Sequence, residues 1–296
     1  MASRVLVFGA QGYLGRVITK QLLSQNIEPV QIFRRGKTLL VMMGGEVREH
    51  KNFETLGKSL LRDSKPLAAV NAAALTTKED SQLAIQNLVE SNVALPAHIA
   101  KICVDIVIER LVHFGTYSTS VDGMNPAPQT FYAASKSAGY EVLRYFTSSE
   151  NLKVVVLEPF DIYAADHPHG KIISTLVESL AKGRELSLSK GEQELAPIHA
   201  LDVAAAAIEA ITIPIEERHS IWSLPGPDVL TLKQIATEIA IALGKESNLN
   251  RLTFENPYRT NEIMTVRPRF AEFPREPLYR VRDGVLVAAL EGSEPF

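Results

Sequence analysis

The sequence predicts an α/β fold in which a parallel sheet is flanked by helices and followed by a smaller C-terminal α/β lobe. In the first half of the chain, short apolar runs alternate with stretches of helical spacing, which is typical of such a sheet. Runs such as Val154-Val155-Val156 have the continuous β-branched pattern of strands that are buried on both faces. A third observation is a loop with three glycines after the first apolar run, which predicts a tight strand-to-helix turn at the start of the sheet.

Five apolar runs predict strands at Val5–Phe8, Pro29–Phe33, Leu67–Ala73, Arg110–Phe114 and Leu152–Leu157. Helical spacing predicts helices at Tyr13–Gln25, Ser81–Cys103, Gln129–Ser148, Lys171–Lys182, Leu201–Ile211 and Leu232–Leu243. The pattern loosens after Pro159, so we divide the chain into a sheet domain, residues 1–160, and a smaller lobe, residues 161–296. Some segments of the lobe are expected to return to the sheet, and most of the stretch after Arg251 to run irregularly over the surface.

Composition excludes several classes of protein. The chain has 296 residues, 46% of them hydrophobic and 22% charged, which is an ordinary globular composition and not that of a disordered chain. The net charge of -3 gives no strong field for nucleic acid or an anionic membrane. The single cysteine, Cys103, excludes an intrachain disulfide, and no apolar run is long enough for a secretory signal or a membrane span, so we expect a cytoplasmic protein.

The glycine loop is the first functional signal. Gly9, Gly12 and Gly15 lie three residues apart, between the first predicted strand and the first predicted helix. In a Rossmann-type sheet, the first glycine allows the tight turn and the second lets the backbone approach a pyrophosphate. The third lets the helix pack closely on the strand, and the pyrophosphate lies on the free N–H groups of the helix end. The alternative is an ordinary glycine-rich turn, but the position at the start of the sheet favours dinucleotide binding.

The end of the second predicted strand indicates which dinucleotide binds. NAD-binding sheets usually have an acidic residue here to accept hydrogen bonds from the ribose, whereas this chain has Arg34 and Arg35. A guanidinium suits a 2′-phosphate and offers no acceptor to a 2′-hydroxyl, so we predict NADP(H) rather than NAD(H). The alternative is a pair of solvated arginines at a strand end.

Tyr132 and Lys136 lie four residues apart, which places a phenol and an ammonium on one face of a helix. A nearby cation stabilises tyrosinate, so we expect the pKa of the phenol to fall and the group to exchange a proton with a carbinol or carbonyl oxygen. The alternative is that the pair has no joint role and combines a surface charge with a side chain that packs in the core. The preceding strand runs into Thr116 and Ser118, whose hydroxyls lie at the ligand-binding end of a parallel sheet unless they only satisfy loop backbone.

Together these residues resemble the extended short-chain dehydrogenase/reductases, in particular the NAD(P)-dependent epimerase/dehydratase branch that acts on nucleotide sugars. Asn71-Ala-Ala-Ala74 is similar to its strand-four motif, Asn92 to its helix-four asparagine, and Phe114-Gly-Thr116 to its catalytic hydroxyl segment. The resemblance implies Thr116, with Ser118 in reserve, Tyr132 and Lys136 as catalytic residues. The predicted cofactor contacts are Gly9, Gln11, Gly12, Tyr13, Leu14, Gly15, Arg34, Arg35, Ala73, Ala74, Asn92, Tyr132, Lys136 and Pro159.

The resemblance also makes residues 161–296 a substrate-binding lobe and residues 1–160 an NADP-binding Rossmann domain. Residues 191–193, 198–203 and 258–264 resemble substrate-lobe motifs. The resemblance implies that Arg259 reaches the diphosphate of a nucleotide sugar and that Thr116 and Ser118 bind its sugar. Departures are Leu195-Ala196, where the family usually has Arg-Asp, and Glu158, where it usually has arginine. The family implies a homodimer and no metal, although His167 and His169 flank a proline in a loop that could suggest one.

Three functions follow from these expectations. The first is NADPH-dependent reduction of a keto group on a sugar nucleotide, of the 4-ketoreductase type, with Tyr132 as proton donor, Lys136 lowering its pKa and Thr116 orienting the carbonyl. The second is a sugar-nucleotide 4-epimerase with tightly bound NAD(P). The third is a catalytically silent NADP-binding regulator, against which the retained Tyr132 and Lys136 argue.

Overall fold

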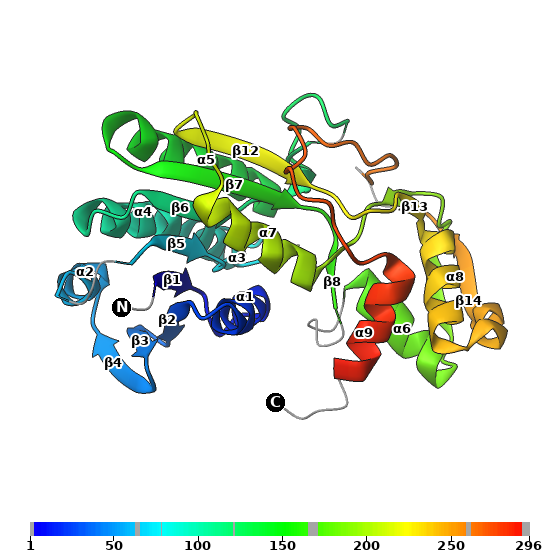
Figure 1. The fold of residues 1–296 in the computed structure, drawn as a ribbon. Helices are drawn as coiled ribbons and strands as arrows, with labels where there is room; N and C mark the ends of the chain where they lie inside the picture. Colours follow the sequence, from blue (N-terminus) through cyan, green and yellow to red (C-terminus); the bar gives the residue numbers. More distant parts are fainter. Residues whose placement is uncertain are drawn as a thin grey trace. The chain divides into compact units, whose positions relative to one another are not determined.

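A computed structural model describes residues 3–62, 66–77, 79–120, 122–164, 171–258 and 262–291, with side chains of the last helix described as far as Val287 (Figure 1). The chain forms two compact units. The first unit comprises Met1–Thr119, Pro128–Glu158 and Ala204–Trp222, and the second comprises Ser120–Ala127, Pro159–Val203 and Ser223–Phe296. The sheet unit is therefore assembled from three segments, and the role of residues 161–296 as a substrate lobe stays a prediction. None of the described helices is long and apolar enough to cross a membrane.

The first unit is built around an eight-stranded sheet with the strand order β12-β7-β6-β5-β1-β2-β3-β4. The strands are β1 (Arg4–Phe8), β2 (Glu28–Arg35), β3 (Thr38–Met43), β4 (Glu46–His50), β5 (Ala68–Asn71), β6 (Arg110–Phe114), β7 (Lys153–Pro159) and β12 (His219–Leu224). The pairs β1–β2, β1–β5, β5–β6 and β6–β7 are parallel, which confirms the predicted Rossmann-type sheet. The central strands are buried along nearly their whole length, as the continuous apolar runs predict.

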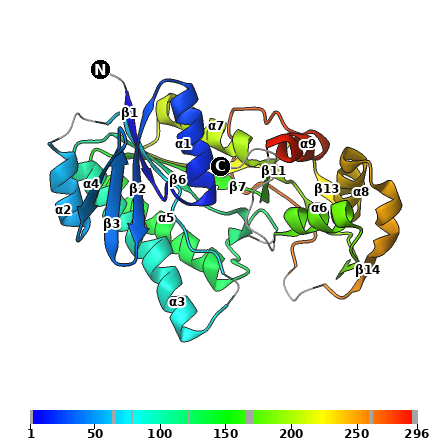
Figure 2. The same ribbon diagram turned by 90° about the horizontal axis from the view of Figure 1, so that it is seen from below.

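Helices cover both faces of this sheet. Figures 1 and 2 show α1 (Tyr13–Ser24) and α7 (Ala200–Thr212) on one face, and α3 (Gln82–Val89), α4 (Leu95–Asp105) and α5 (Phe131–Ser149) on the other. A π-helical turn, η1 (Glu90–Ala94), joins α3 to α4, and α2 (Phe53–Leu60) packs on α4. The predicted helices Tyr13–Gln25, Ser81–Cys103 and Gln129–Ser148 are thus confirmed.

One edge of the sheet differs from the predicted alternation of strand and helix. After β2 the chain turns back twice, so that β3 pairs antiparallel with β2 and β4 pairs antiparallel with β3. Gly36, with a φ of 60°, lies in the first two-residue turn, and Gly44 and Gly45, with φ of 56° and 85°, form the second. Residues with positive φ are what tight two-residue hairpin turns require.

The second unit has its own apolar core. Its helices are α6 (Ile172–Lys182), α8 (Leu232–Leu243) and α9 (Val281–Glu291), and its strand pairs are β8 (Ile162–Tyr163) with β11 (Ile198–His199), β9 (Leu186–Ser189) with β14 (Leu252–Asn256), and β10 (Glu194–Leu195) with β13 (Leu230–Thr231). Helix α9 lies in the stretch after Arg251, most of which is expected to be irregular, and its Val281 and Val285 are buried in this core. Between β14 and α9, the described residues form no further named helix or strand.

Candidate active site

The glycine loop lies between β1 and α1, where the strand order of the sheet reverses. From β1 the chain runs to β2 on one side and later returns to β5 on the other, and ligands of open parallel sheets bind at such a switch point. Gly9 has a φ of 78° and donates its N–H to Ile32 O at 2.8 Å. A Cβ at Gly9 would lie 2.6 Å from Ala73 N, so a larger residue fits neither the backbone conformation nor the space.

The start of α1 fits a phosphate group. Gly12 is the N-cap, no side chain caps this end of the helix, and the first turn holds no acidic residue. A Cβ at Gly15 would lie 2.1 Å from Gly9 O, so glycine lets the helix approach the loop closely. The positive end of the helix dipole and its backbone N–H groups therefore face the loop without a competing side chain, as pyrophosphate binding requires. Gln11, Tyr13 and Leu14 belong to this loop and first turn.

Arg34 and Arg35 lie at the carboxyl end of β2, as the sequence predicts. Arg35 is exposed, and Arg34 is half exposed and 3.9 Å from the Glu90 carboxylate of η1. An exposed ion pair at this distance contributes little, so it is no obstacle to a 2′-phosphate. Whether these arginines bind the 2′-phosphate of NADP(H) stays a prediction.

Asn92 is held by protein groups. Its side chain is 1% exposed, and its two amide protons go to Leu75 O at 3.1 Å and Ser135 Oγ at 3.0 Å. Its Oδ1 also accepts the Leu75 N–H at 3.3 Å. The side chain therefore fastens the loop after β5 to α5, and because both donors are used, a direct bond from this amide to a cofactor stays a prediction. The half-buried Ala73 and the exposed Ala74 lie in the same loop.

Tyr132 lies in the first turn of α5, which begins where the Thr130 side chain accepts the Ala133 N–H at 3.2 Å. The phenol is hydrogen-bonded to the hydroxyls of Thr116 and Thr76. Thr116 Oγ1 is in turn 2.9 Å from Ser118 Oγ. Thr116, the first choice from sequence, is thus the hydroxyl that contacts the phenol, and Ser118 reaches it only through Thr116.

Thr76 was missed from sequence. The only signal for it is its place in the loop after β5, two residues beyond Ala74. Thr76 is exposed, and its hydroxyl is hydrogen-bonded to the Tyr132 phenol. A hydroxyl in that place extends the hydrogen-bonded set around Tyr132.

Lys136 is 2% exposed and donates from Nζ to Phe114 O at 2.6 Å. Burial penalises the charged form and lowers the pKa of Lys136 to about 8. The expectation that Lys136 lowers the pKa of Tyr132 needs correction, because burial raises the pKa of the phenol and the hydrogen bonds from Thr76 and Thr116 offset this only in part. Without a bound ligand, Tyr132 is therefore a protonated phenol at neutral pH.

The arrangement combines a dinucleotide loop, a protonated phenol, a hydroxyl partner and a buried lysine in one unit. The model of the NAD dependent epimerase/dehydratase family matches residues 5–222. This chain belongs to that family. It is an NAD(P)-dependent enzyme of the extended short-chain dehydrogenase/reductase type, as the sequence predicts.

Solved structures share the epimerase/dehydratase fold over the whole chain. MoeE5 in complex with UDP-glucose and NAD is 20% identical, with a TM-score of 0.78 and coverage of 98% of this chain and 98% of that chain. UDP-glucose 4-epimerase from Thermotoga maritima is 14% identical, with a TM-score of 0.79 and 97% coverage of each chain. UDP-N-acetylglucosamine 4-epimerase from Bacillus cereus is 18% identical, with a TM-score of 0.77 and coverage of 100% and 99%. No curated protein sequence matches the chain.

No contact among the described residues joins the other predicted site residues, treated next, to Tyr132. Pro159 ends β7 and belongs to the second unit. Arg259, His167 and His169 lie outside the described residues. Within the part of the chain that is described, no three His, Cys, Asp or Glu side chains lie close enough together to hold a metal ion.

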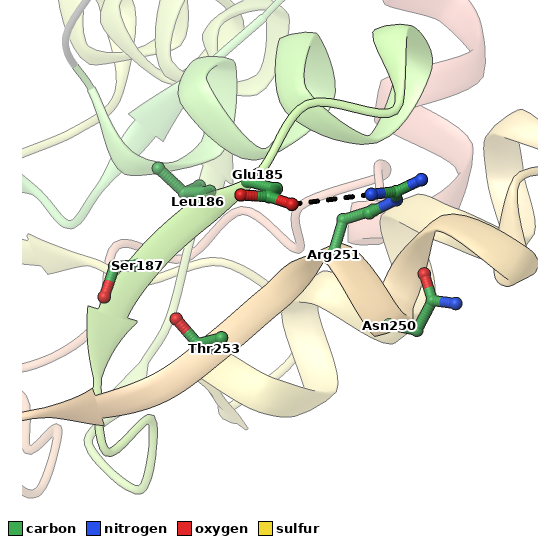
Figure 3. A pocket seen from close by; sticks show the side chains of 6 residues that line it. All are labelled: Glu185, Leu186, Ser187, Asn250, Arg251 and Thr253. Atoms are coloured by element: carbon green, nitrogen blue, oxygen red, sulfur yellow. Dashed lines mark hydrogen bonds and ion pairs between the residues drawn. The ribbon is translucent and has the colours of Figure 1, made fainter.

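The second unit has a surface hollow of its own, distinct from the residues above. It is lined by Glu185, Leu186, Ser187, Asn250, Arg251 and Thr253. Figure 3 shows the Arg251 guanidinium beside the Glu185 carboxylate, at 3.4 Å. This ion pair neutralises the charges of the hollow, which therefore offers no strong attraction to a phosphate or a cation.

Proposed function

We propose that this protein reduces a keto group on a sugar nucleotide with NADPH, as a reductase of the 4-ketoreductase type. The hydrogen bond between the Thr116 hydroxyl and the Tyr132 phenol supports the proposal, because a proton donor and a second hydrogen-bond donor would then serve one carbonyl oxygen near the carboxyl end of β6. The substrate class is supported by two of the similar solved structures, a MoeE5 complex with UDP-glucose and a UDP-N-acetylglucosamine 4-epimerase. Residues 161–296 would bind that substrate, with Arg259 at its diphosphate.

The chain's own residues account for the proton chemistry. NADPH, when bound, supplies the hydride. Tyr132 is a protonated phenol at neutral pH, so it would supply the proton to a carbonyl oxygen that becomes an alcohol. Thr116 would hydrogen-bond the same oxygen. Lys136 gives one of its three N–H donors to Phe114 O, and the others suit the hydroxyls of a nicotinamide ribose.

The coenzyme preference rests on Arg34 and Arg35. Replacing Arg34 by Asp should weaken NADPH binding by on the order of tenfold or more and improve NADH binding, because a charge-assisted phosphate contact is lost and a ribose acceptor gained. Fluorescence titration of both coenzymes against the parent and Arg34→Asp measures this. Unchanged NADPH binding would show that Arg34 does not hold the 2′-phosphate.

A second candidate function is 4-epimerisation of a sugar nucleotide with retained NAD(P). The similar structures from Thermotoga maritima and Bacillus cereus favour it, because both proteins are 4-epimerases. The same phenol, hydroxyl and lysine serve both reactions, since an epimerase withdraws and returns hydride at one carbon. The two candidates differ in whether NADPH is consumed.

One assay separates the candidates. The purified protein is mixed with NADPH and a panel of keto-sugar nucleotides, and separately with ordinary sugar nucleotides. Substrate-dependent loss of NADPH absorbance supports the reductase, whereas inversion at one carbon with no net loss of coenzyme supports the epimerase. Coenzyme binding with no turnover of any substrate would contradict both and support a regulator.

The proposal includes a homodimer formed through α3, α4 and α5, which the family resemblance suggests. Size-exclusion chromatography with light scattering measures the mass directly. A mass of about one chain would exclude this assembly at the concentration used. A cytoplasmic location likewise stays a prediction, and cell fractionation would test it.

A further inference from the structure

A buried chain of hydrogen bonds lies on the other side of Thr116 from the catalytic phenol. The Thr116 N–H donates to Tyr140 OH at 3.1 Å, and Tyr140 OH donates to Glu158 Oε1 at 2.8 Å. Thr119 Oγ1 donates to the same carboxylate oxygen at 3.3 Å. Tyr140, Glu158 and Thr119 are 4%, 1% and 0% exposed. Burial of a carboxylate costs free energy unless hydrogen bonds compensate it, and here the Tyr140 and Thr119 hydroxyls donate to it.

The end of β6 is shaped to admit this pair. A Cβ at Gly115 would lie 2.0 Å from Tyr140 OH and 3.0 Å from Glu158 Cγ, so any larger residue there would displace the phenol and the carboxylate. Gly115 also donates its N–H to Leu157 O at 2.7 Å, which ties the segment to β7. The backbone around Thr116 therefore has close contacts on two sides.

Helix α5 is hydrogen-bonded to this segment at two points. Tyr132, Lys136 and Tyr140 are spaced by four residues and so share one face of the helix. Lys136 binds Phe114 O and Tyr140 binds Thr116 N, one on each side of Gly115. The helix that carries the catalytic phenol thus also fixes the backbone of its hydroxyl partner.

The direction of the Tyr140 proton follows from its neighbours. Burial and the Glu158 carboxylate raise the pKa of Tyr140 well above its usual value, so the phenol stays protonated. Its single proton goes to Glu158, which leaves the oxygen lone pairs to accept from Thr116 N. The Glu158 carboxylate therefore sets the direction in which the Tyr140 hydroxyl holds Thr116.

We propose that Tyr140 and Glu158 are positioning residues that lock the backbone of Thr116 and so aim its hydroxyl at the substrate oxygen beside Tyr132. The inference rests on the proposed function of Thr116 as a hydrogen-bond donor to substrate. A misplacement of a reacting group by about 1 Å is enough to cost on the order of 100-fold in rate.

The test is Tyr140→Phe, which removes the hydroxyl and keeps the ring. We expect kcat to fall on the order of 10- to 100-fold with KM unchanged, and the Thr116 amide to exchange its hydrogen faster in NMR spectra. Thr119→Val is the matched control, because it removes another buried hydroxyl from the same carboxylate without touching Thr116, and its kcat should stay within about twofold. In a Thr116→Val background, Tyr140→Phe should cost nothing further in kcat, because it acts only through that hydroxyl.

Several results would overturn the inference. Unchanged exchange of the Thr116 amide in Tyr140→Phe would do so, as would losses of kcat that add in the double variant. If Tyr140→Phe does not fold, Glu158→Gln and Glu158→Met replace it: glutamine keeps an acceptor for the phenol proton and should retain most of the rate, and methionine should not. Equal rates for these two variants contradict the inference. Absence of turnover by the parent protein would count against the proposed function alone, since amide exchange still decides how Thr116 is held.

Discussion

The two units use buried charge in different ways. Among the described residues of the first unit, the buried charged side chains are Lys136 and Glu158, and both bond to the segment around Thr116, directly or through Tyr140. In the described part of the second unit, the buried charged side chain is Asp202, which accepts the N–H groups of Leu278 and Tyr279 at 3.0 Å each. The carboxylate of the second unit therefore fastens backbone, whereas the charges of the first surround a candidate reacting group.

The two units differ in how far hydrogen bonds compensate the free-energy cost of burying a charge. Burying an ionised group is unfavourable unless bonds compensate it, and Asp202 is compensated by two backbone donors. Lys136 donates to Phe114 O, and burial lowers its pKa to about 8, so this bond compensates the charge only in part. Uncompensated charge of this kind clusters at functional sites. The buried lysine of the first unit is thus less fully compensated than the buried carboxylate of the second.

The largest effect is expected at the phenol. Tyr132→Phe should lower kcat by on the order of 100- to 10,000-fold, because the proton donor is removed while the ring is kept. Binding of NADPH should be unchanged, which fluorescence titration checks beside the turnover assay. A fully active Tyr132→Phe variant would show that another group moves the proton, and the contrast between the units would lose its chemical basis.

The next effect concerns the glycine loop. Gly15→Ala should lower the free energy of unfolding by several kcal/mol, about the range of overpacked core sites, because the new Cβ would lie 2.1 Å from Gly9 O. Gly57→Ala is the matched control, since its nearest neighbour would be Ile102 Cγ1 at 3.8 Å, and there a helical alanine should stabilise by about 0.5–1 kcal/mol. Urea unfolding of the two variants gives both values, and equal stabilities would mean that α1 and the loop relax freely.

The elements that sequence predicts well are those whose pattern is set locally. Strands β1, β5, β6 and β7 are buried on both faces, so each reads as a continuous apolar run. Strand β4 was not predicted, because all but one of its residues are exposed and Glu46–His50 has no apolar alternation. The Gly44-Gly45 turn before it is the signal that could have revealed the hairpin.

Helix α9 is an element that local sequence pattern does not predict. Gly284 weakens its helical pattern, yet glycine is required there because a Cβ would lie 2.2 Å from Tyr163 OH. That contact joins residues far apart in the sequence, so no local rule predicts it. Tertiary packing in this case overrides the intrinsic preference of the residue.

The candidate site divides in the same way. The glycine loop and the spacing of Tyr132 and Lys136 are local patterns, and both were recognisable. The roles of Thr76, Tyr140 and Glu158 depend on side chains from different elements meeting in space, which spacing does not encode. The raised pKa of Tyr132 likewise depends on burial, which the sequence shows only indirectly.

A third effect is a pH dependence of stability that belongs to Lys136. Its pKa is 10.5 as a free group and about 8 in the folded protein, so between these values the unfolded chain binds more protons than the folded one. The stability of the parent should therefore rise relative to Lys136→Met as pH increases from about 8 towards 10, by at most about 1.4 kcal/mol per pH unit. Below about pH 8 the difference should be constant. Urea unfolding of both proteins across this range measures it, and a difference that is flat throughout would mean that the lysine is fully compensated.

A fourth effect separates the buried carboxylate of the second unit from an exposed one. Asp202→Asn leaves a single acceptor oxygen for the N–H groups of Leu278 and Tyr279, so one charge-assisted bond is lost and the free energy of unfolding should fall by about 1.5–3 kcal/mol. Glu185→Gln is the matched control, because that carboxylate is 83% exposed and pairs with Arg251 at the surface, where such pairs contribute little. NADPH binding should be the same in both variants, since neither residue belongs to the unit that holds the glycine loop. Equal stabilities of the two variants would mean that burial does not distinguish these carboxylates, and that the second unit tolerates a buried, partly unsatisfied group as the first one does.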